Sequence, residues 1–223
     1  MWTSMAWLKI LDIEVITNRD IKKDESYLVV ANHLSYLDVL VISSVIPCSF
    51  VTSLEIKATS VLGHLTMLSG CLYVNRKDKS KINLEIKELV EALGRNISVT
   101  FFPEATSTDG SNVLRFRKPL FEASISSGKL ILPMTINYLE ISKQAVTTRN
   151  KDFLFWYGDM TFYPHFMNLL CQSKIKIKLD IHEPFKPEIY PVLELAEKAH
   201  KVISGTYQPI SNATEHIQAT QLS

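Results

Sequence analysis

Short apolar runs alternate with segments of helical periodicity along most of the chain. Tyr27 to Ala31 is a short β-branched run, a pattern typical of a buried strand. Apolar residues recur at i, i+4, i+7, i+8 and i+11 from Ile82, which predicts an amphipathic helix from Ser80 to Leu93 that Gly94 can stop. Strands that alternate with helices predict an α/β fold, in which helices flank a mainly parallel or mixed central sheet.

The remaining elements follow from the same two periods. Lys174 to Ile181 alternates lysines with apolar residues, which predicts a half-buried strand. Further strands are expected at 50–52, 72–74, 97–102, 130–139 and 153–157, and further helices from Val39, at 54–68, at 119–126 and at 191–202. Glycine and proline are sparse and no segment between these elements resembles a linker, so we expect a single domain.

The N-terminal segment places Trp2 and Trp7 among apolar neighbours with a single charge, Lys9. Because tryptophan favours the membrane interface, the segment is interpreted as an amphipathic helix lying in that interface; packing against the domain is the alternative. No apolar run reaches the ~17–25 residues that span a bilayer. We therefore expect an interfacial helix at 1–12, the domain at 13–205 and a polar, flexible tail at 206–223.

Composition narrows the class of protein. The chain has 223 residues, 46% of them hydrophobic, which is enough for one domain with a substantial core. Its formal net charge of +1 is far below that of a typical nucleic-acid-binding protein, so we expect no nucleic-acid partner. The three cysteines lie far apart without CxxC spacing, which argues against a disulfide framework or a zinc cluster.

One concentration of polar residues follows the predicted strand that ends at Ala31. His33 is followed five positions later by Asp38, at the start of the next predicted helix. If Ser35 caps that helix, Asp38 lies one turn in and can orient the His33 ring, which leaves the other ring nitrogen free as a base. The spacing alone leaves an ordinary interpretation open, because Ser-x-x-Asp is also a common helix-capping pattern.

Two further strand ends carry polar residues. One strand delivers Glu104, Thr106 and Ser107 into a loop, where α/β sheets place binding sites, although a polar turn closed by Asp-Gly is also common without one. Arg76 directly follows another predicted strand and is suited to an anionic headgroup, although a lone arginine there is also typical of an ordinary surface.

Taken in order, four segments resemble the glycerolipid acyltransferases, the family that includes 1-acylglycerol-3-phosphate acyltransferase. The first matches that family's His-x4-Asp block with a preceding asparagine, and the second ends a strand on arginine. The third matches Phe-Pro-Glu-Gly-Thr except at the glycine, and the fourth is an apolar strand around a proline. The matching residues are Asn32, His33 and Asp38; Tyr73 to Arg76; Phe102, Pro103, Glu104 and Thr106; and Ile131 to Met134. Their ordered combination over residues 5 to 205 is specific, although each motif alone is not.

The resemblance implies an O-acyltransferase of phospholipid biosynthesis, peripheral or monotopic on the cytoplasmic face of a membrane. His33, oriented by Asp38, would deprotonate the free hydroxyl of a lysolipid acceptor. That hydroxyl would attack the thioester of acyl-CoA or of an acyl-carrier protein directly, without an acyl-enzyme. No metal ion and no redox cofactor is implied.

The same resemblance assigns substrate-binding residues. Glu104 and Thr106 would position the acceptor, and Arg76 would pair with its headgroup. Three basic residues are candidates for the lipid phosphate, the coenzyme A phosphates or an acidic carrier protein: Arg115, Arg117 and Lys118.

Two positions depart from the family pattern and bear on the acceptor. Ala105 stands where the family usually has glycine, so the loop is expected to lose a left-handed conformation or a close substrate approach. Ser107 stands where many members carry an arginine implicated in holding the acceptor phosphate. Lysophosphatidate remains the first expectation for the acceptor. A lyso-ornithine lipid is the alternative, because its acyltransferases often have a Ser/Thr-rich loop with Asp-Gly at this point.

Three rival classes fit less well. A serine hydrolase would need a Gly-x-Ser-x-Gly elbow, which the sequence does not contain. A metal hydrolase built on His33, Asp38 and His64 would lack recognisable ligand spacing. A non-catalytic lipid-binding protein would require a decayed site, whereas His33, Asp38, Glu104 and Arg76 are intact.

Overall fold

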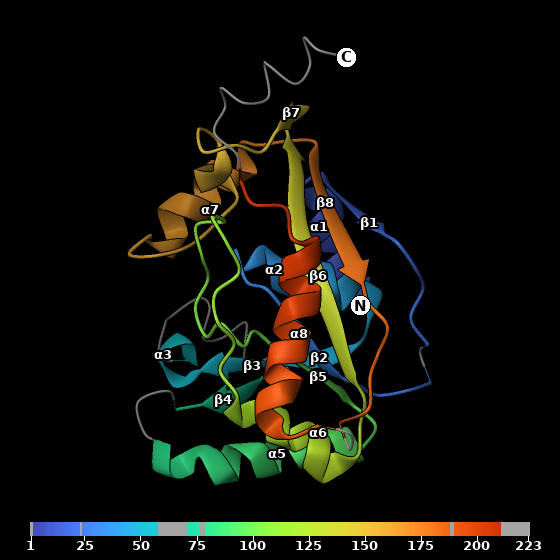
Figure 1. The fold of residues 1–223 in the computed structure, drawn as a ribbon. Coiled ribbons are helices and arrows are strands. Elements are labelled where there is room, and N and C mark those ends of the chain that lie inside the picture. The colour runs from blue at the N-terminus through green and yellow to red at the C-terminus, as the bar shows by residue number, and fades with distance from the viewer. Residues whose placement is uncertain (1, 23, 58–70, 76–78, 188–189, 211–223) are drawn as a thin grey trace.

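The computed structural model of the chain describes residues 2–22, 24–57, 71–75, 79–187 and 190–210. Within these residues an eight-stranded sheet forms the centre, in the order β1-β8-β6-β2-β5-β3-β4 with β7 paired to β6 (Figure 1). The strands are β1 (Ile13–Thr17), β2 (Leu28–Ala31), β3 (Cys48–Ser53), β4 (Leu72–Val74), β5 (Ser98–Phe101), β6 (Ile131–Ile141), β7 (Gln144–Ala145) and β8 (Ile175–Ile181). The described helices are α1 (Trp2–Ile10), α2 (Leu37–Val45), α3 (Leu54–Lys57), α5 (Ile82–Gly94), α6 (Glu122–Ser127), α7 (Phe162–Leu170) and α8 (Val192–Thr206), with 3-10 turns η1 (Lys79–Lys81), η2 (Pro119–Phe121) and η3 (Lys151–Phe153).

Most strands of the sheet run parallel. β2 pairs in parallel with β5 and β6, and β3 pairs in parallel with β5 and β4. β8 pairs antiparallel with β6 and parallel with β1, so these two outer strands reverse the direction of the sheet. The predicted α/β fold, with a mixed central sheet flanked by helices and a helix at the N-terminus, is confirmed.

Helices cover both faces of the sheet. In β2, Val29 and Ala31 enter one hydrophobic core while Leu28 and Val30 enter another, as the two-residue period of a strand requires. The first core contains residues of α1, α2 and α7, and the second contains residues of α5, α6 and α8. In Figure 1, α8 lies in front of the sheet, and α1 and α2 lie behind it. We call these two sides the α2 face and the α8 face.

Helix α1 packs on α2 through one narrow side. Ser4, Leu8 and the following Leu11 are buried at positions i, i+4 and i+7, whereas Trp2 and Trp7 are exposed. The helix therefore packs on the domain and still presents its tryptophans to the surroundings. Among the described residues, we find no helix with both the length and the apolar character needed to cross a membrane.

The prediction of a strand over 153–157 is wrong. η3 ends at Phe153, and the N–H groups of Leu154 and Phe155 both donate to the carbonyl of Lys151 at 2.8 Å, which curls the backbone into a turn. Leu154 and Phe155 are fully buried, so their apolar character reflects packing in the core. A short apolar run does not by itself distinguish a strand from a buried turn.

Two predicted segments extend beyond the described residues. Helix α3 occupies the start of the helix predicted over 54–68, and 58–70 lie outside the described residues. In the predicted tail, the Tyr207 hydroxyl and the Ile210 N–H both donate to the Gly110 carbonyl, at 2.8 and 3.0 Å. The first tail residues therefore pack on the domain. Because 211–223 lie outside the described residues, the domain boundaries stay a prediction.

Candidate functional site

The first and third motif segments meet at the carboxyl ends of β2 and β5. These strands are parallel neighbours, with Val30 of β2 in register with Phe101 of β5. Both strands therefore deliver the chain to the same edge of the sheet, where His33 and Glu104 follow. The Thr108 N–H donates to the His33 carbonyl at 3.0 Å and joins the two loops.

Asp38 holds the ring of His33 in one orientation. His33 Nδ1 lies 2.9 Å from Asp38 Oδ2, and the Asp38 side chain is fully buried. The same oxygen accepts hydrogen bonds from the N–H groups of Leu34 (2.7 Å) and Ser35 (2.9 Å). Because an ionised carboxylate only accepts, Nδ1 of His33 is the donor and Nε2 carries the lone pair.

The start of α2 differs from the prediction. The helix begins at Leu37 with Tyr36 as its N-cap, so the cap lies one residue later than Ser35 and Asp38 is the second helical residue. The Asp38 carboxylate itself accepts from the loop amides that precede the helix. A carboxylate in the first turn is favoured by the helix dipole, so the same residue stabilises the helix start and orients the histidine.

Tyr138 is a part of the site that sequence reasoning missed. Its hydroxyl donates to Asp38 Oδ1 at 2.8 Å from the neighbouring strand β6. Burial, together with the charge of Asp38, raises the pKa of Tyr138 well above its usual value, which keeps the hydroxyl a donor. The Asn32 amide exchanges two hydrogen bonds with the backbone of Ile136, at 3.0 and 2.8 Å, and ties the loop before His33 to β6.

The His33 ring is supported on one side and remains accessible. The Phe102 ring stacks on it with 4.0 Å between centroids and 9° between planes. The His33 side chain keeps 20% of its exposure. The arrangement therefore leaves an oriented and partly accessible imidazole, the geometry that a general base requires.

The Glu104 carboxylate bridges two backbone segments. Oε1 accepts from the His33 N–H at 2.8 Å, and Oε2 accepts from the Leu114 N–H at 2.7 Å. Burial raises the pKa of Glu104 to about 7, although these two hydrogen bonds act in the opposite direction. Both oxygens hold the loop in place, so the expected contact of Glu104 with the acceptor stays a prediction.

The loop after Glu104 keeps an unusual backbone conformation. Ala105 has φ +61°, in the left-handed region that favours glycine. The expected loss of that conformation is therefore wrong, because alanine adopts it here. Thr106 is exposed, and the Ser107 hydroxyl donates to the Trp156 carbonyl at 2.5 Å. Their expected contacts with the acceptor stay predictions.

The predicted cations occupy separate places. Arg76 and His64 lie outside the described residues. Arg117 is exposed, and its N–H donates to the Pro103 carbonyl at 2.8 Å. Lys118 is half-buried and lines a cavity beside α8. No hydrogen bond joins either residue to His33 in the described part of the chain, so their binding roles stay predictions.

Known proteins resemble this chain in sequence. A family model described as Acyltransferase matches residues 12–137. A 1-acyl-sn-glycerol-3-phosphate acyltransferase from Neisseria gonorrhoeae is 31% identical over 153 residues, which cover 69% of this chain and 58% of that protein. A lyso-ornithine lipid O-acyltransferase from Rhizobium meliloti (strain 1021) is 27% identical over 189 residues, which cover 82% of this chain and 64% of that protein. The chain thus spans less than two thirds of the length of these relatives.

A solved structure agrees with the fold. The crystal structure of a 1-acyl-sn-glycerophosphate acyltransferase from Thermotoga maritima matches with a TM-score of 0.68 and 20% identity, over 97% of this chain and 77% of that one. The family match covers more than half of the chain and includes His33, Asp38 and Glu104. The chain belongs to the acyltransferase family.

Proposed function

We propose that the protein is a lysolipid O-acyltransferase, which moves a fatty acyl group from acyl-CoA or an acyl-carrier protein to the free hydroxyl of a lysolipid. The observation that carries this proposal is the hydrogen-bonded series Tyr138–Asp38–His33, with distances of 2.8 and 2.9 Å. It fixes Nδ1 of His33 as the donor to Asp38 and leaves Nε2 available to accept a proton. The family and the names of both relatives support the same reaction.

The proposed transfer is a direct displacement. The acceptor hydroxyl gives its proton to Nε2 of His33 while its oxygen attacks the thioester carbonyl. The new C–O bond forms, the C–S bond breaks, and His33 returns the proton to the leaving thiolate. No acyl group is held by the enzyme, so an acylated serine trapped during turnover would contradict this step and favour a serine hydrolase.

The remaining assigned residues act on binding in this proposal. Glu104 and Thr106 position the acceptor, and Arg76 pairs with its headgroup. Ser107 lies in the same loop as Glu104 and Thr106 and borders the acceptor. Arg117 and Lys118 attract the anionic parts of the acyl donor.

The first acceptor we propose is 1-acylglycerol-3-phosphate, with phosphatidate as the product. A lyso-ornithine lipid is the second candidate, because the relative of that name matches 82% of the chain. Serine at position 107 also makes a neutral hydrogen bond at a point where a second arginine would serve a phosphate. Competition between the two acceptors with one donor decides between them, and Ser107→Arg should shift selectivity toward the phosphate.

We also propose that the protein binds one leaflet of a membrane peripherally, on the cytoplasmic side. Trp2 and Trp7 of α1 are exposed. Helix α7 exposes Tyr163, Met167 and Leu170 at positions i, i+4 and i+7, and its sequence contains no charged residue. An uncharged helix that leaves an apolar stripe outside the core is suited to the acyl-chain boundary of a bilayer.

The test of the proposed reaction is turnover by the purified full chain. Acyl-CoA and acyl-carrier protein are each offered with lysophosphatidate and lyso-ornithine lipid in mixed vesicles, and diacyl products are identified by mass. Formation of a diacyl lipid with loss of the thioester is expected. Lysolipid binding without turnover under any of the four pairings would favour a non-catalytic lipid-binding protein.

A further inference from the structure

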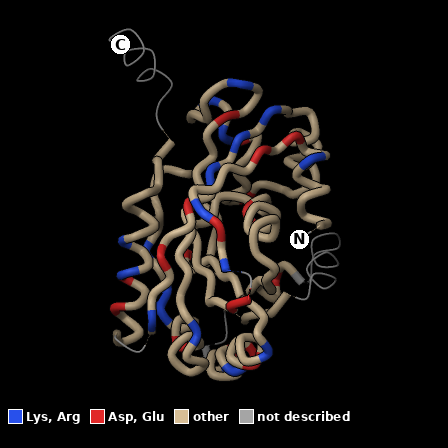
Figure 2. Tube along the Cα trace, turned by 90° about the vertical axis from the view of Figure 1, so that its right-hand side faces the viewer, with Lys and Arg blue, Asp and Glu red and all other residues tan. Residues whose placement is uncertain are grey.

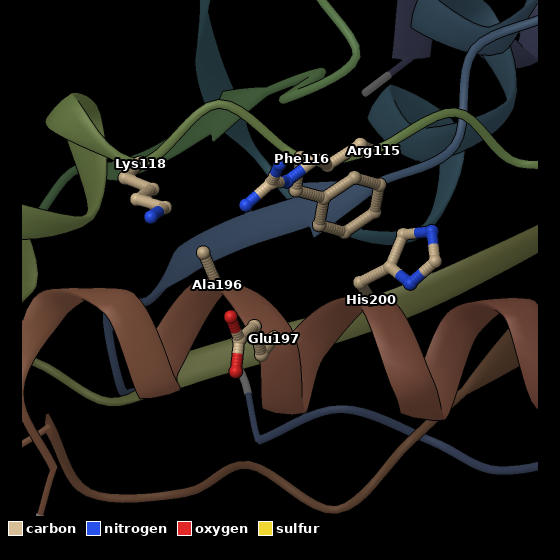
Figure 3. Close-up of a pocket in the computed structure, with 6 residues that line it drawn as sticks. All are labelled: Arg115, Phe116, Lys118, Ala196, Glu197 and His200. Atoms are coloured by element: carbon tan, nitrogen blue, oxygen red, sulfur yellow. The ribbon is translucent and has the colours of Figure 1, made fainter.

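A cavity of about 220 Å³ lies between α8 and the chain segment that follows Glu104. Figure 3 shows that the two walls face each other, with side chains of the segment on one side and of α8 on the other. The lining residues are Arg115, Phe116, Lys118, Ala196, Glu197 and His200. The cavity is on the α8 face of the sheet, because Phe116 and Ala196 belong to the core of that face.

Packing fixes the shape of this cavity. Phe116 is buried, and its ring meets the His200 ring edge-on, with 5.0 Å between centroids. His200 Nε2 lies 3.3 Å from the Val113 carbonyl and donates to it. These contacts attach the segment to α8, and they place the neighbouring cations on a constrained backbone.

The two cations of the cavity are available to a ligand. In the described part of the chain, no ion pair or cation–π contact is made by Arg115 or Lys118. Arginine presents a planar fork of donors, and lysine adds a second positive charge, a combination suited to a phosphate group. Glu197 also lines the cavity and reduces its net positive charge.

A short connection joins this cavity to the proposed base. The Glu104 carboxylate accepts from the His33 N–H and from the Leu114 N–H, and Leu114 is the residue next to Arg115. The exposed apolar residues of α1 and α7, in contrast, belong to helices of the α2 face. The cavity is therefore beside the catalytic loop but on the opposite side of the sheet from the proposed membrane contact.

We propose that this cavity binds a phosphate of the acyl donor, an inference that rests on the proposed function. A lysolipid reaches His33 from the membrane, whereas the carrier of the thioester is anionic and stays in water. Coenzyme A and the prosthetic arm of an acyl-carrier protein both contain a phosphopantetheine phosphate. Arg115 and Lys118 bind that group or the nucleotide phosphates of coenzyme A, and the flexible pantetheine spans the distance to His33.

The main test compares donors with and without phosphate on the full-length protein. The wild type should use acyl-CoA or acyl-carrier protein with a lower KM than acyl-pantetheine, which lacks phosphate. Arg115→Ala/Lys118→Ala should raise KM for the phosphate-bearing donors roughly 10- to 100-fold, the range expected for lost charge-assisted hydrogen bonds. Its KM for acyl-pantetheine and for the lysolipid should stay within about two-fold of the wild-type values, since neither uses these cations.

The two carriers distinguish which phosphate is bound. A greater rise in KM with acyl-CoA than with acyl-carrier protein identifies the nucleotide phosphates, and an equal rise identifies the shared phosphopantetheine phosphate.

Two further variants act as controls. Arg95→Ala removes an exposed arginine after α5, away from the cavity, and should leave KM for every substrate unchanged. Glu197→Gln removes the negative charge from the cavity and should lower KM for the phosphate-bearing donors roughly three-fold or more. A variant that merely damages folding would not improve donor binding, so this gain distinguishes the site from a structural role.

Three results would overturn the proposal. They are equal wild-type KM values with and without phosphate, a double-variant loss that is the same for acyl-pantetheine, and a loss confined to the lysolipid. The last result would place the acceptor headgroup in the cavity. Absence of acyl transfer by the wild type with every donor and acceptor would instead refute the proposed function, and coenzyme A binding measured by calorimetry would still test the cavity.

Discussion

The two faces of the sheet differ in what they present to the surroundings. Within the described residues, α1 and α7 on the α2 face expose seven large apolar side chains, whereas the longer helices α5 and α8 on the other face expose only two. The seven are Trp2, Met5, Trp7, Ile10, Tyr163, Met167 and Leu170. Scattered exposed apolar residues are normal in any protein, but a concentration of this kind on two short helices is what the proposed membrane contact requires.

Charge has the opposite distribution. Helix α7 contains no charged residue, while α8 carries Glu194, Glu197, Lys198 and Lys201. Figure 2 shows these charged positions on the helix that leads to the C-terminal trace. His33 lies at the carboxyl end of the central strand β2, and Glu104 joins its backbone to that of Leu114 beside the cavity of the α8 face. Under the proposed function, this difference would let one histidine serve a lipid from a membrane and a donor from water.

The largest expected effect comes from removing the proposed base, His33. His33→Ala should reduce kcat at least ~10²-fold, the usual scale for loss of a general base, with every donor and acceptor. Asp38→Asn should be impaired less severely, because the imidazole remains and loses only its oriented acceptor. Kinetics with each donor, alongside liposome flotation, check this prediction. Near-normal turnover by His33→Ala would show that the proposed mechanism is wrong. Unchanged flotation of this variant would show that membrane binding does not depend on His33.

Local patterns were enough to predict much of this architecture. The helix predicted from the apolar period differs from α5 by two residues at its start and by one at its end. The strand predicted over 72–74 has the same bounds as β4. The spacing of His33 and Asp38 anticipated their contact, because residues on either side of a helix start are close whatever the rest of the fold does. Such features depend on neighbouring residues along the chain, and a sequence displays those directly.

The features that were missed depend on distant residues. Tyr138 reaches Asp38 only because β6 pairs beside β2, and an apolar strand pattern does not reveal which tyrosine faces a carboxylate. The cavity beside α8 requires the packing of Phe116 on His200, residues far apart in sequence. Predicting these contacts requires the strand order and helix placement first.

A second expected effect concerns Glu104, which joins loops that lead to the two faces. Folding raises its pKa from 4.5 to about 7 through burial, so the folded state binds this proton more tightly than the unfolded chain does. Its contribution to stability is fully present below about pH 4.5 and is lost as the pH rises through about 7, with a change of up to about 3 kcal/mol. Glu104→Gln should lose this fall in the free energy of unfolding, measured with urea between pH 4.5 and 8.

A matched variant isolates the Glu104 effect. Glu194 is exposed on α8, so Glu194→Gln should keep the wild-type pH profile. Parallel profiles for wild type and Glu104→Gln would contradict the assignment, because other titrating groups would then account for the whole pH dependence.

Helices α1 and α7 are each expected to contribute to the affinity for the membrane. Trp2→Ser/Trp7→Ser and Tyr163→Ser/Met167→Ser should each weaken flotation with liposomes roughly ten-fold or more, since each removes apolar area that would leave water.

A matched pair on the other face controls for general hydrophobicity. Leu84→Ser/Leu193→Ser removes the two exposed leucines of α5 and α8, and it should float like the wild type. Equal loss from all three pairs would contradict the difference between the faces. Unchanged flotation of the Trp2→Ser/Trp7→Ser variant would mean that α1 serves only the core.

The smallest effect is expected at Ala105, on the loop that leads from the His33 side toward the α8 face. Its φ of +61° costs alanine about 1 kcal/mol that glycine would not incur, and this gain is partly offset by the greater freedom of glycine in the unfolded chain. Ala105→Gly should therefore stabilise the fold by less than about 1 kcal/mol. Gly128→Ala is the reciprocal control, because Gly128 has φ +67° with open space around it and should lose a similar amount. Urea unfolding of both variants measures whether the free energy of unfolding rises for Ala105→Gly and falls for Gly128→Ala.

The effect of Ala105→Gly on catalysis is expected to be small. Since the loop already has the conformation that glycine favours, Ala105→Gly should leave kcat/KM for both lysolipids within about two-fold. A large gain for one acceptor would show that the alanine methyl group itself selects the headgroup.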